Sequence, residues 1–280
     1  MSHTTGFWES FDGTKLFFRY WPAENPKAAV YLVHGMGEHS GRYEHVASFF
    51  NEKGFSCIAF DLRGHGMSGG KRGHAKSYEA IMRDVDTFFE KARLAEPAVP
   101  SFLYGHSLGG NIVLNYALRR NPNVAGVIAT SPWLRLTTPL PKLQLALAQV
   151  AAFFAPDLVV KTNLDPAGLS RNKAVATAYM NDELVHGFIS VRFLKEVVRA
   201  GEYALDGAEG FPLPLLLVHG TDDPITSYAA SKEFADRSPK AELASWSGLF
   251  HETHNDDSWK DVLESNFQWM ISRISSKDQA

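Results

Sequence analysis

The sequence predicts an α/β fold: a mostly parallel eight-stranded sheet flanked by helices, with one helical insertion. Short apolar runs alternate with helical patterns before residue 131 and again after residue 200. These runs are apolar without interruption, which is typical of strands buried on both faces of a parallel sheet. Between residues 132 and 200 the alternation stops, prolines recur and no strand pattern is visible. We therefore expect one core, 1–131 and 201–280, interrupted by a helical insertion at 132–200.

The expected elements follow in chain order. FWES and KLFFRYW, joined through Asp12-Gly13, predict an antiparallel hairpin at the sheet edge. Four buried strands are expected next, at AAVYLVHG, FSCIAFD, SFLYGHS and NVAGVIATS. Helical patterns lie between them at 43–52, 78–94 and LGGNIVLNYALRR. After the insertion, PLPLLLVHG and AELASW predict the last two strands, with helices at 227–237 and 259–275.

Composition excludes several classes of protein. The net charge is −3, so the basic excess of a nucleic-acid-binding protein is lacking, and we expect no nucleic-acid partner. Cys57 is the single cysteine, which rules out a disulfide within the chain. No basic segment followed by an apolar run opens the sequence, so we expect no signal peptide and a cytoplasmic location. Polar residues and prolines interrupt the apolar stretch 143–160, which argues against a membrane-spanning helix.

Two serines lie in G-x-S-x-G patterns, Ser68 and Ser107. A nucleophilic serine of this kind needs a strand running into it and a helix leaving it, because that sharp turn exposes the hydroxyl above the sheet. Ser107 has both, in SFLYGH before it and LGGNIVLNYALRR after it. Ser68 is followed by GGKRGH, which does not favour a helix, so we interpret it as a loop residue. Ser107 is the candidate nucleophile.

The loop around Ser68 also contains G-x-G-x-x-G, at residues 64–69. A dinucleotide site requires a helix starting at those glycines and an acidic residue at a strand end about 20 residues later. Glycines and basic residues at 70–73 disfavour that helix, and Asp84 and Asp86 fall in a helical pattern. We therefore expect no nucleotide cofactor.

A serine nucleophile needs a general base, and the base needs a carboxylate to orient it. When the chain order is serine, acid, histidine, the acid follows a late strand, and PLPLLLVHG ends at Asp222-Asp223. Spacing from the strand-end glycine favours Asp223 over Asp222. The base is expected in the loop after AELASW, where His251 comes first and His254 lies near it. These two histidines are three residues apart in a predicted loop, unlike the helical zinc pattern, so we expect no metal.

Ester or amide hydrolysis also needs two donors for the oxyanion of the tetrahedral intermediate. We expect one donor to be the backbone N–H of Leu108, directly after the candidate nucleophile. The other is expected in the turn His34-Gly-Met36-Gly37, from the N–H of Met36. No organic cofactor is required for this chemistry.

Several motifs together identify a family. They are HGMGEHSGRYEHVA (34–47), DLRGHGMSGGKRGH (61–74), GHSLGG, LSRNKAV (169–175), GTDDPIT and SGLFHETHND. With them the sequence resembles the monoacylglycerol lipase and lysophospholipase branch of the α/β-hydrolases, from about Phe7 to Ile274. The resemblance implies that the insertion is a helical cap with an apolar entrance facing the membrane. It also implies that Glu38, Arg42 and His254 lie near the glycerol end of the substrate.

We therefore expect a serine esterase that cleaves monoacylglycerols or similar single-chain lipid esters through an acyl-enzyme on Ser107. A lysophospholipase or a broad carboxylesterase would use the same residues, and a serine aminopeptidase or a non-catalytic lipid receptor are the remaining alternatives. We further expect peripheral membrane contact through the cap, by an apolar helix at 143–154. The sequence does not indicate an oligomeric state.

Overall fold

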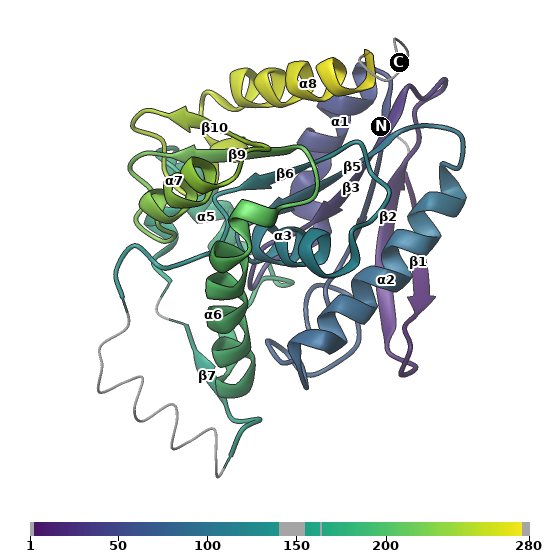
Figure 1. The fold of residues 1–280 in the computed structure, drawn as a ribbon. Helices are drawn as coiled ribbons and strands as arrows, with labels where there is room; N and C mark the ends of the chain where they lie inside the picture. The colour runs from purple at the N-terminus through teal and green to yellow at the C-terminus, as the bar shows by residue number, and fades with distance from the viewer. Residues whose placement is uncertain (1–2, 140–154, 163, 276–280) are drawn as a thin grey trace.

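A computed structural model describes residues 3–139, 155–162 and 164–275. Its centre is an eight-stranded sheet in the order β1-β2-β4-β3-β5-β6-β9-β10 (Figure 1). β1 pairs antiparallel with β2, and β2 pairs antiparallel with β4, whereas the remaining pairs are parallel. The strands are β1 (Thr4–Glu9), β2 (Lys15–Trp21), β3 (Ala28–Val33), β4 (Phe55–Phe60), β5 (Ser101–His106), β6 (Gly126–Thr130), β9 (Leu215–Gly220) and β10 (Ala241–Trp246). The predicted fold class and the hairpin at the sheet edge are confirmed.

Helices cover both faces of the sheet because its strands are apolar on both sides. In β3, Tyr31 packs toward the face covered by α2, α3, α6 and α7, and its neighbour Leu32 packs toward α1 and α8. Figure 1 shows α1 and α8 together on one side and α2 and α3 on the other. The helices are α1 (Glu44–Glu52), α2 (Tyr78–Ala95), α3 (Leu108–Arg120), α5 (Lys173–Asn181), α6 (Val191–Asp206), α7 (Tyr228–Arg237) and α8 (Trp259–Ser275). Short 3-10 turns lie at η1 (Ser40–Tyr43), η2 (Pro166–Gly168), η3 (Ala208–Gly210) and η4 (Thr253–Asn255).

The insertion contains a feature that the sequence pattern did not indicate. Two three-residue strands, β7 (Val159–Lys161) and β8 (Phe188–Ser190), pair antiparallel. The expectation of no strand between 132 and 200 was therefore wrong. Strands of three residues are too short for a visible period-two pattern, and their partners lie far apart in the sequence. The apolar helix expected at 143–154 lies outside the described residues.

The insertion is joined to the core by α6, which passes through the expected boundary at residue 200. Its middle packs on α3, where Asn115 Nδ2 donates to the carbonyl of Ala200 at 2.9 Å. Gly201 lets the backbone of α6 approach the segment that contains Leu134, because a methyl group at Gly201 would lie 2.1 Å from the Leu134 carbonyl oxygen. Within the described ranges, no helix has the length and apolar character needed to cross a membrane.

Candidate active site

Ser107 occupies a strained turn between β5 and α3. Its backbone has φ 53° and ψ −113°, a conformation that non-glycine residues adopt only where the surroundings impose it. Its N–H donates to Thr130 O at 2.9 Å, and its carbonyl accepts from Trp133 N at 2.9 Å. The glycines of the motif are needed for space, since a methyl group on Gly109 would lie 2.0 Å from the carbonyl of Val33. The strand and helix predicted around Ser107 are present, as the nucleophile turn requires.

Ser68 lies in a loop, where its side chain is used structurally. Its hydroxyl accepts from Phe17 N at 2.8 Å and donates to Asp61 O at 2.5 Å. The surrounding glycines have positive φ values and build a compact turn, and α2 begins only at Tyr78. The helix that a dinucleotide site needs at residues 64–69 is therefore not formed at those glycines.

Asp223 and His251 come together because β9 and β10 are parallel neighbours, and their carboxyl ends meet at one edge of the sheet. His251 Nδ1 lies 2.8 Å from Asp223 Oδ2, and both side chains are buried. The Asp223 carboxylate also accepts backbone N–H bonds from Ile225 at 2.7 Å and from Thr226 at 3.0 Å. Asp222 is exposed, and its carboxylate accepts from the hydroxyl of Thr221. The geometry favours Asp223 as the partner of the histidine.

The environment sets the charges of this pair. Burial opposes ionisation of Asp223, but His251 and His219 lower its pKa well below the usual range. Burial also opposes the charged form of His251, yet the Asp223 carboxylate raises the pKa of that ring. His251 is therefore a stronger base than an ordinary histidine, and its charged form has a counter-ion in place. The carbonyl of His251 accepts from Ser131 Oγ at 2.7 Å, which fixes the loop behind the ring.

The loop after β3 approaches Ser107 and presents the peptide of Met36. A methyl group on Gly35 would lie 3.2 Å from Cβ of Ser107. His34 Nδ1 lies 2.8 Å from the carbonyl of Gly35, and His34 Nε2 accepts from Leu62 N at 2.9 Å. These partners place the ring proton on Nδ1, so His34 donates to Gly35. Because the peptide is trans, the N–H of Met36 points away from that held carbonyl.

The second expected donor is the N–H of Leu108, the first residue of α3. The first N–H groups of a helix have no partner within the helix, and the helix dipole favours negative charge beside them. Ser107 precedes this helix without capping it by its side chain. The N–H of Leu108 is therefore suited to donate a hydrogen bond to an oxyanion.

Glu38, Arg42 and His254 belong to one buried network next to the loop. Glu38 Oε1 accepts from Gly35 N at 2.6 Å and from Tyr43 Oη at 2.7 Å, while its Oε2 accepts from Arg42 at 2.7 Å. His254 is fully buried, stacked on Tyr43 at 5.0 Å between ring centres. Neither of its ring nitrogens has a hydrogen-bond partner among the described residues. Burial lowers the pKa of His254 to about 3, so the ring is neutral.

Three residues of the site were missed by sequence reasoning or interpreted as structural. Glu252 holds Arg42 through two hydrogen bonds, at 2.7 and 2.8 Å. Thr226 Oγ1 lies 2.8 Å from Asp223 Oδ2, and His219 Nε2 lies 3.1 Å from the same oxygen. Of these three residues, only Glu252 could have been found from the sequence, because it directly follows the candidate base.

No set of His, Cys, Asp and Glu side chains in the described part of the chain is arranged to hold a metal ion.

The sheet order, the strained serine turn and the buried histidine–aspartate pair define an α/β-hydrolase of the serine hydrolase class. The chain matches the family model described as "Serine aminopeptidase, S33" over residues 24–258. It therefore belongs to that family of α/β-hydrolases.

Its relatives include lipases. A monoacylglycerol lipase from Mycolicibacterium smegmatis is 33% identical over 266 residues, which are 94% of this chain and 95% of that protein. An uncharacterized abhydrolase domain-containing protein from Dictyostelium discoideum is 38% identical over 270 residues, which are 95% of this chain but only 28% of that protein. The crystal structure of a monoacylglycerol lipase from Paleococcus ferrophilus has a TM-score of 0.84 and 36% identity, covering 92% of this chain and 99% of that one.

Proposed function

We propose that this chain hydrolyses monoacylglycerols, or similar single-chain lipid esters, to a fatty acid and an alcohol. The observation that carries the proposal is that the strained Ser107 turn lies beside the buried His251–Asp223 pair. The ring of His106, the residue before Ser107, lies 4.8 Å from the ring of His251. The similarity to monoacylglycerol lipases over nearly the whole chain supports the substrate class.

In the proposed mechanism, Ser107 Oγ attacks the ester carbonyl while His251 Nε2 takes its proton. Asp223 holds His251 by the Nδ1 proton and stabilises the imidazolium that forms. The amides of Met36 and Leu108 stabilise the oxyanion, and His251 then gives the proton to the departing alcohol oxygen. Water, deprotonated by His251, attacks the acyl-enzyme, and collapse of the second intermediate releases the acid and restores Ser107.

Glu38, Arg42 and His254 are assigned to the alcohol end of the substrate in this proposal. His254 supports the assignment through its two unpartnered ring nitrogens, which are able to hydrogen-bond a hydroxyl group. Both carboxylate oxygens of Glu38 are already occupied, so it acts chiefly by holding the loop of Gly35. Arg42 in turn forms ion pairs with the carboxylates of both Glu38 and Glu252.

The test is active-site labelling followed by a substrate panel. A fluorophosphonate probe should label the native protein and a Ser68→Ala control but not Ser107→Ala. The panel compares 1- and 2-monoacylglycerols with lysophosphatidylcholine, triacylglycerol and an aminoacyl amide. Fastest turnover of lysophosphatidylcholine would replace the proposal with a lysophospholipase, and absence of labelling would favour a non-catalytic receptor.

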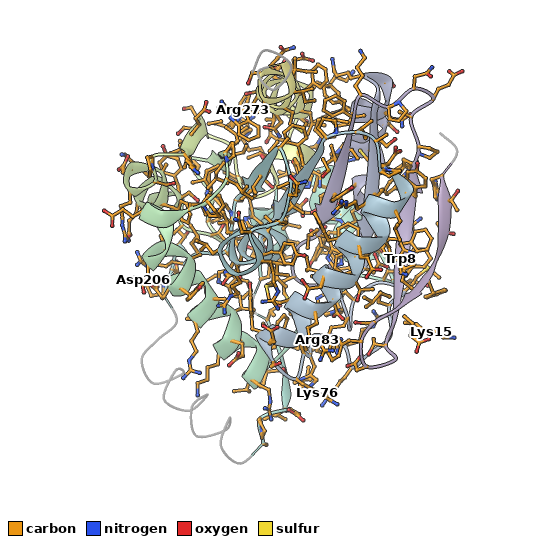
Figure 2. The ribbon with its side chains drawn as sticks, turned by 45° about the vertical axis from the view of Figure 1, so that its right-hand side comes forward. Trp8, Lys15, Lys76, Arg83, Asp206 and Arg273 are labelled. Atoms are coloured by element: carbon orange, nitrogen blue, oxygen red, sulfur yellow. The ribbon has the colours of Figure 1, made fainter. Side chains whose placement is uncertain are left out.

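We also propose that the cap contacts membranes. Leu158, Val160 and Phe188 are 49%, 37% and 38% exposed around the β7–β8 pair. Lys71 Nζ donates to the carbonyl of Asp157 and so brings a basic side chain to the same rim. Figure 2 shows Lys76 at the lower end of the molecule, toward which α6 descends from Asp206. Apolar side chains beside basic ones suit a surface of anionic lipid.

Co-sedimentation with vesicles of phosphatidylcholine and phosphatidylserine tests this contact. Leu158→Glu should reduce the bound fraction several-fold. Leu94→Glu is the matched control, because Leu94 is 67% exposed on α2 and lies outside the cap. Equal binding of both variants and the native protein would contradict the proposed surface.

A further inference from the structure

One oxygen of Asp223 is shared by side chains from three parts of the fold. Oδ2 lies 2.8 Å from His251 Nδ1, 2.8 Å from Thr226 Oγ1 and 3.1 Å from His219 Nε2. His251 therefore competes with a second histidine for the carboxylate oxygen that orients it. The mechanism described above makes no use of His219.

His219 is held in one tautomer and one orientation. It lies in β9, is fully buried, and its Nδ1 is 2.8 Å from Ser231 Oγ on α7. Its Nε2 faces only acceptors, namely Asp223 Oδ2 and the carbonyl of Thr226 at 3.2 Å. Nε2 must therefore carry the proton, and Nδ1 accepts the hydroxyl proton of Ser231. His219 donates a hydrogen bond to Asp223 through Nε2.

We propose that His219 is a positioning residue that holds Asp223 and limits how strongly that carboxylate raises the basicity of His251. A donor to a carboxylate stabilises its charge and draws electron density away from its other contacts. Without that donor, Oδ2 would bind the Nδ1 proton of His251 more strongly, and the ring would become more basic. The inference rests on the proposed function, because it concerns the same candidate base.

The two histidines share two residues, Asp223 and Thr226. The carbonyl of Thr226 lies 3.2 Å from His219 Nε2, and its Oγ1 lies 3.2 Å from His251 Nδ1. Asp223 is the charged one of the two, so an effect on the charge felt by His251 passes through Asp223. The ring of His219 packs edge-on against Tyr228, at 5.9 Å between ring centres, and its charged neighbour is Asp223. The charged and titratable groups that face His251 are Asp223, Glu252, Glu38, His106 and His254. A substitution at His219 leaves all of these groups in the chain. It removes the bond from His219 to Asp223 together with its contacts with Ser231 and the Thr226 carbonyl.

The experiment measures the pKa of His251 directly, by NMR titration of its ring nitrogens, with the signal assigned from its loss in His251→Gln. In His219→Met, which keeps the side-chain length and removes the donor, the pKa of His251 should rise by about 0.5 pH unit or more. In His219→Gln the amide nitrogen occupies the position of Nε2 and still donates, so the pKa should stay within about 0.2 pH unit of the native value. The midpoint of kcat/KM against pH should move in parallel.

Two further variants complete the design. Ser231→Ala removes the hydroxyl that orients His219 and leaves Asp223 unchanged. It should raise the pKa of His251 by less than His219→Met does, and it tests the inference independently if His219→Met does not fold. Tyr228→Phe keeps the ring beside His219 and should leave the pKa of His251 unchanged. An unchanged pKa of His251 in both His219→Met and Ser231→Ala would overturn the inference. Because the NMR readout needs no turnover, that result is distinct from a failure of the native protein to hydrolyse lipid esters.

Discussion

Arg42→Met is the substitution whose consequence the structure defines most sharply. Arg42 supplies the positive charge between the carboxylates of Glu38 and Glu252, with contacts of 2.7, 2.7 and 2.8 Å. The side chains of these two glutamates are only 3% and 2% exposed. Methionine keeps the unbranched apolar stem of the side chain and removes its charged end, so two carboxylates of like sign would remain buried together.

The loss of stability in Arg42→Met depends on the hydrogen bonds that each carboxylate retains. Glu38 retains its bonds from Gly35 and Tyr43, and Glu252 retains one from Asn255 Nδ2 at 2.7 Å. Removing one member of a buried ion pair costs about 3–5 kcal/mol. A folded domain is stable by roughly 5–15 kcal/mol, so this is a large fraction of the total.

Glu252→Gln is the matched comparison. It leaves Arg42 paired with Glu38, one charge against one, and replaces a charged acceptor by a neutral amide. We expect it to cost about 1 kcal/mol, in the range of a single hydrogen bond. The two variants change the same ion pair from its two sides, and only Arg42→Met leaves both buried carboxylates without a cationic partner.

Urea unfolding at pH 7, followed by tryptophan fluorescence, measures both free energies. A second series at pH 5 tests the electrostatic cause, because protonation of a destabilised carboxylate should reduce the loss in Arg42→Met. The reasoning would be refuted if Arg42→Met lost no more stability than Glu252→Gln, or if its loss were the same at both pH values.

Three further predictions concern the proposed site and its histidines. Asp223→Asn should lower kcat by about 10³-fold or more, whereas Asp222→Asn should change it less than about twofold, and steady-state kinetics that rank them otherwise would reassign the acid. Because the Asp223 carboxylate raises the pKa of His251, kcat/KM should rise with pH through a midpoint above 6.5, and a midpoint below this ordinary value would contradict the assignment. His254 has a folded pKa of about 3 against an ordinary value of 6.5, so below pH 6.5 the unfolded chain binds a proton that the native ring does not. That group alone should reduce the free energy of unfolding by up to about 5 kcal/mol between pH 6.5 and 3, and a urea midpoint independent of pH would exclude it.

The fold and the order of the candidate residues were predictable because both depend on local patterns. The continuous apolar strands, their spacing and the glycines around Ser107 constrain the backbone within a few residues, and the structure confirms them. The pair β7 and β8 was not predictable, because six residues that pair across a long separation carry no periodic signal. The second carboxylate partner of Arg42 was likewise hidden, since Glu252 lies 210 positions from it.

By itself the sequence determined the class of fold, and it predicted the chemical types of the candidate nucleophile, acid and base. Both depend on strand–turn–helix context and chain order, which are read from the sequence directly. Spacing along the chain favoured Asp223 over Asp222, but only the tertiary structure showed which carboxylate faces His251 across two parallel strands. The tertiary structure also decided that His219 shares that carboxylate. A hydrogen bond of about 3 Å requires side chains from separate strands to converge, and chain spacing does not encode that convergence.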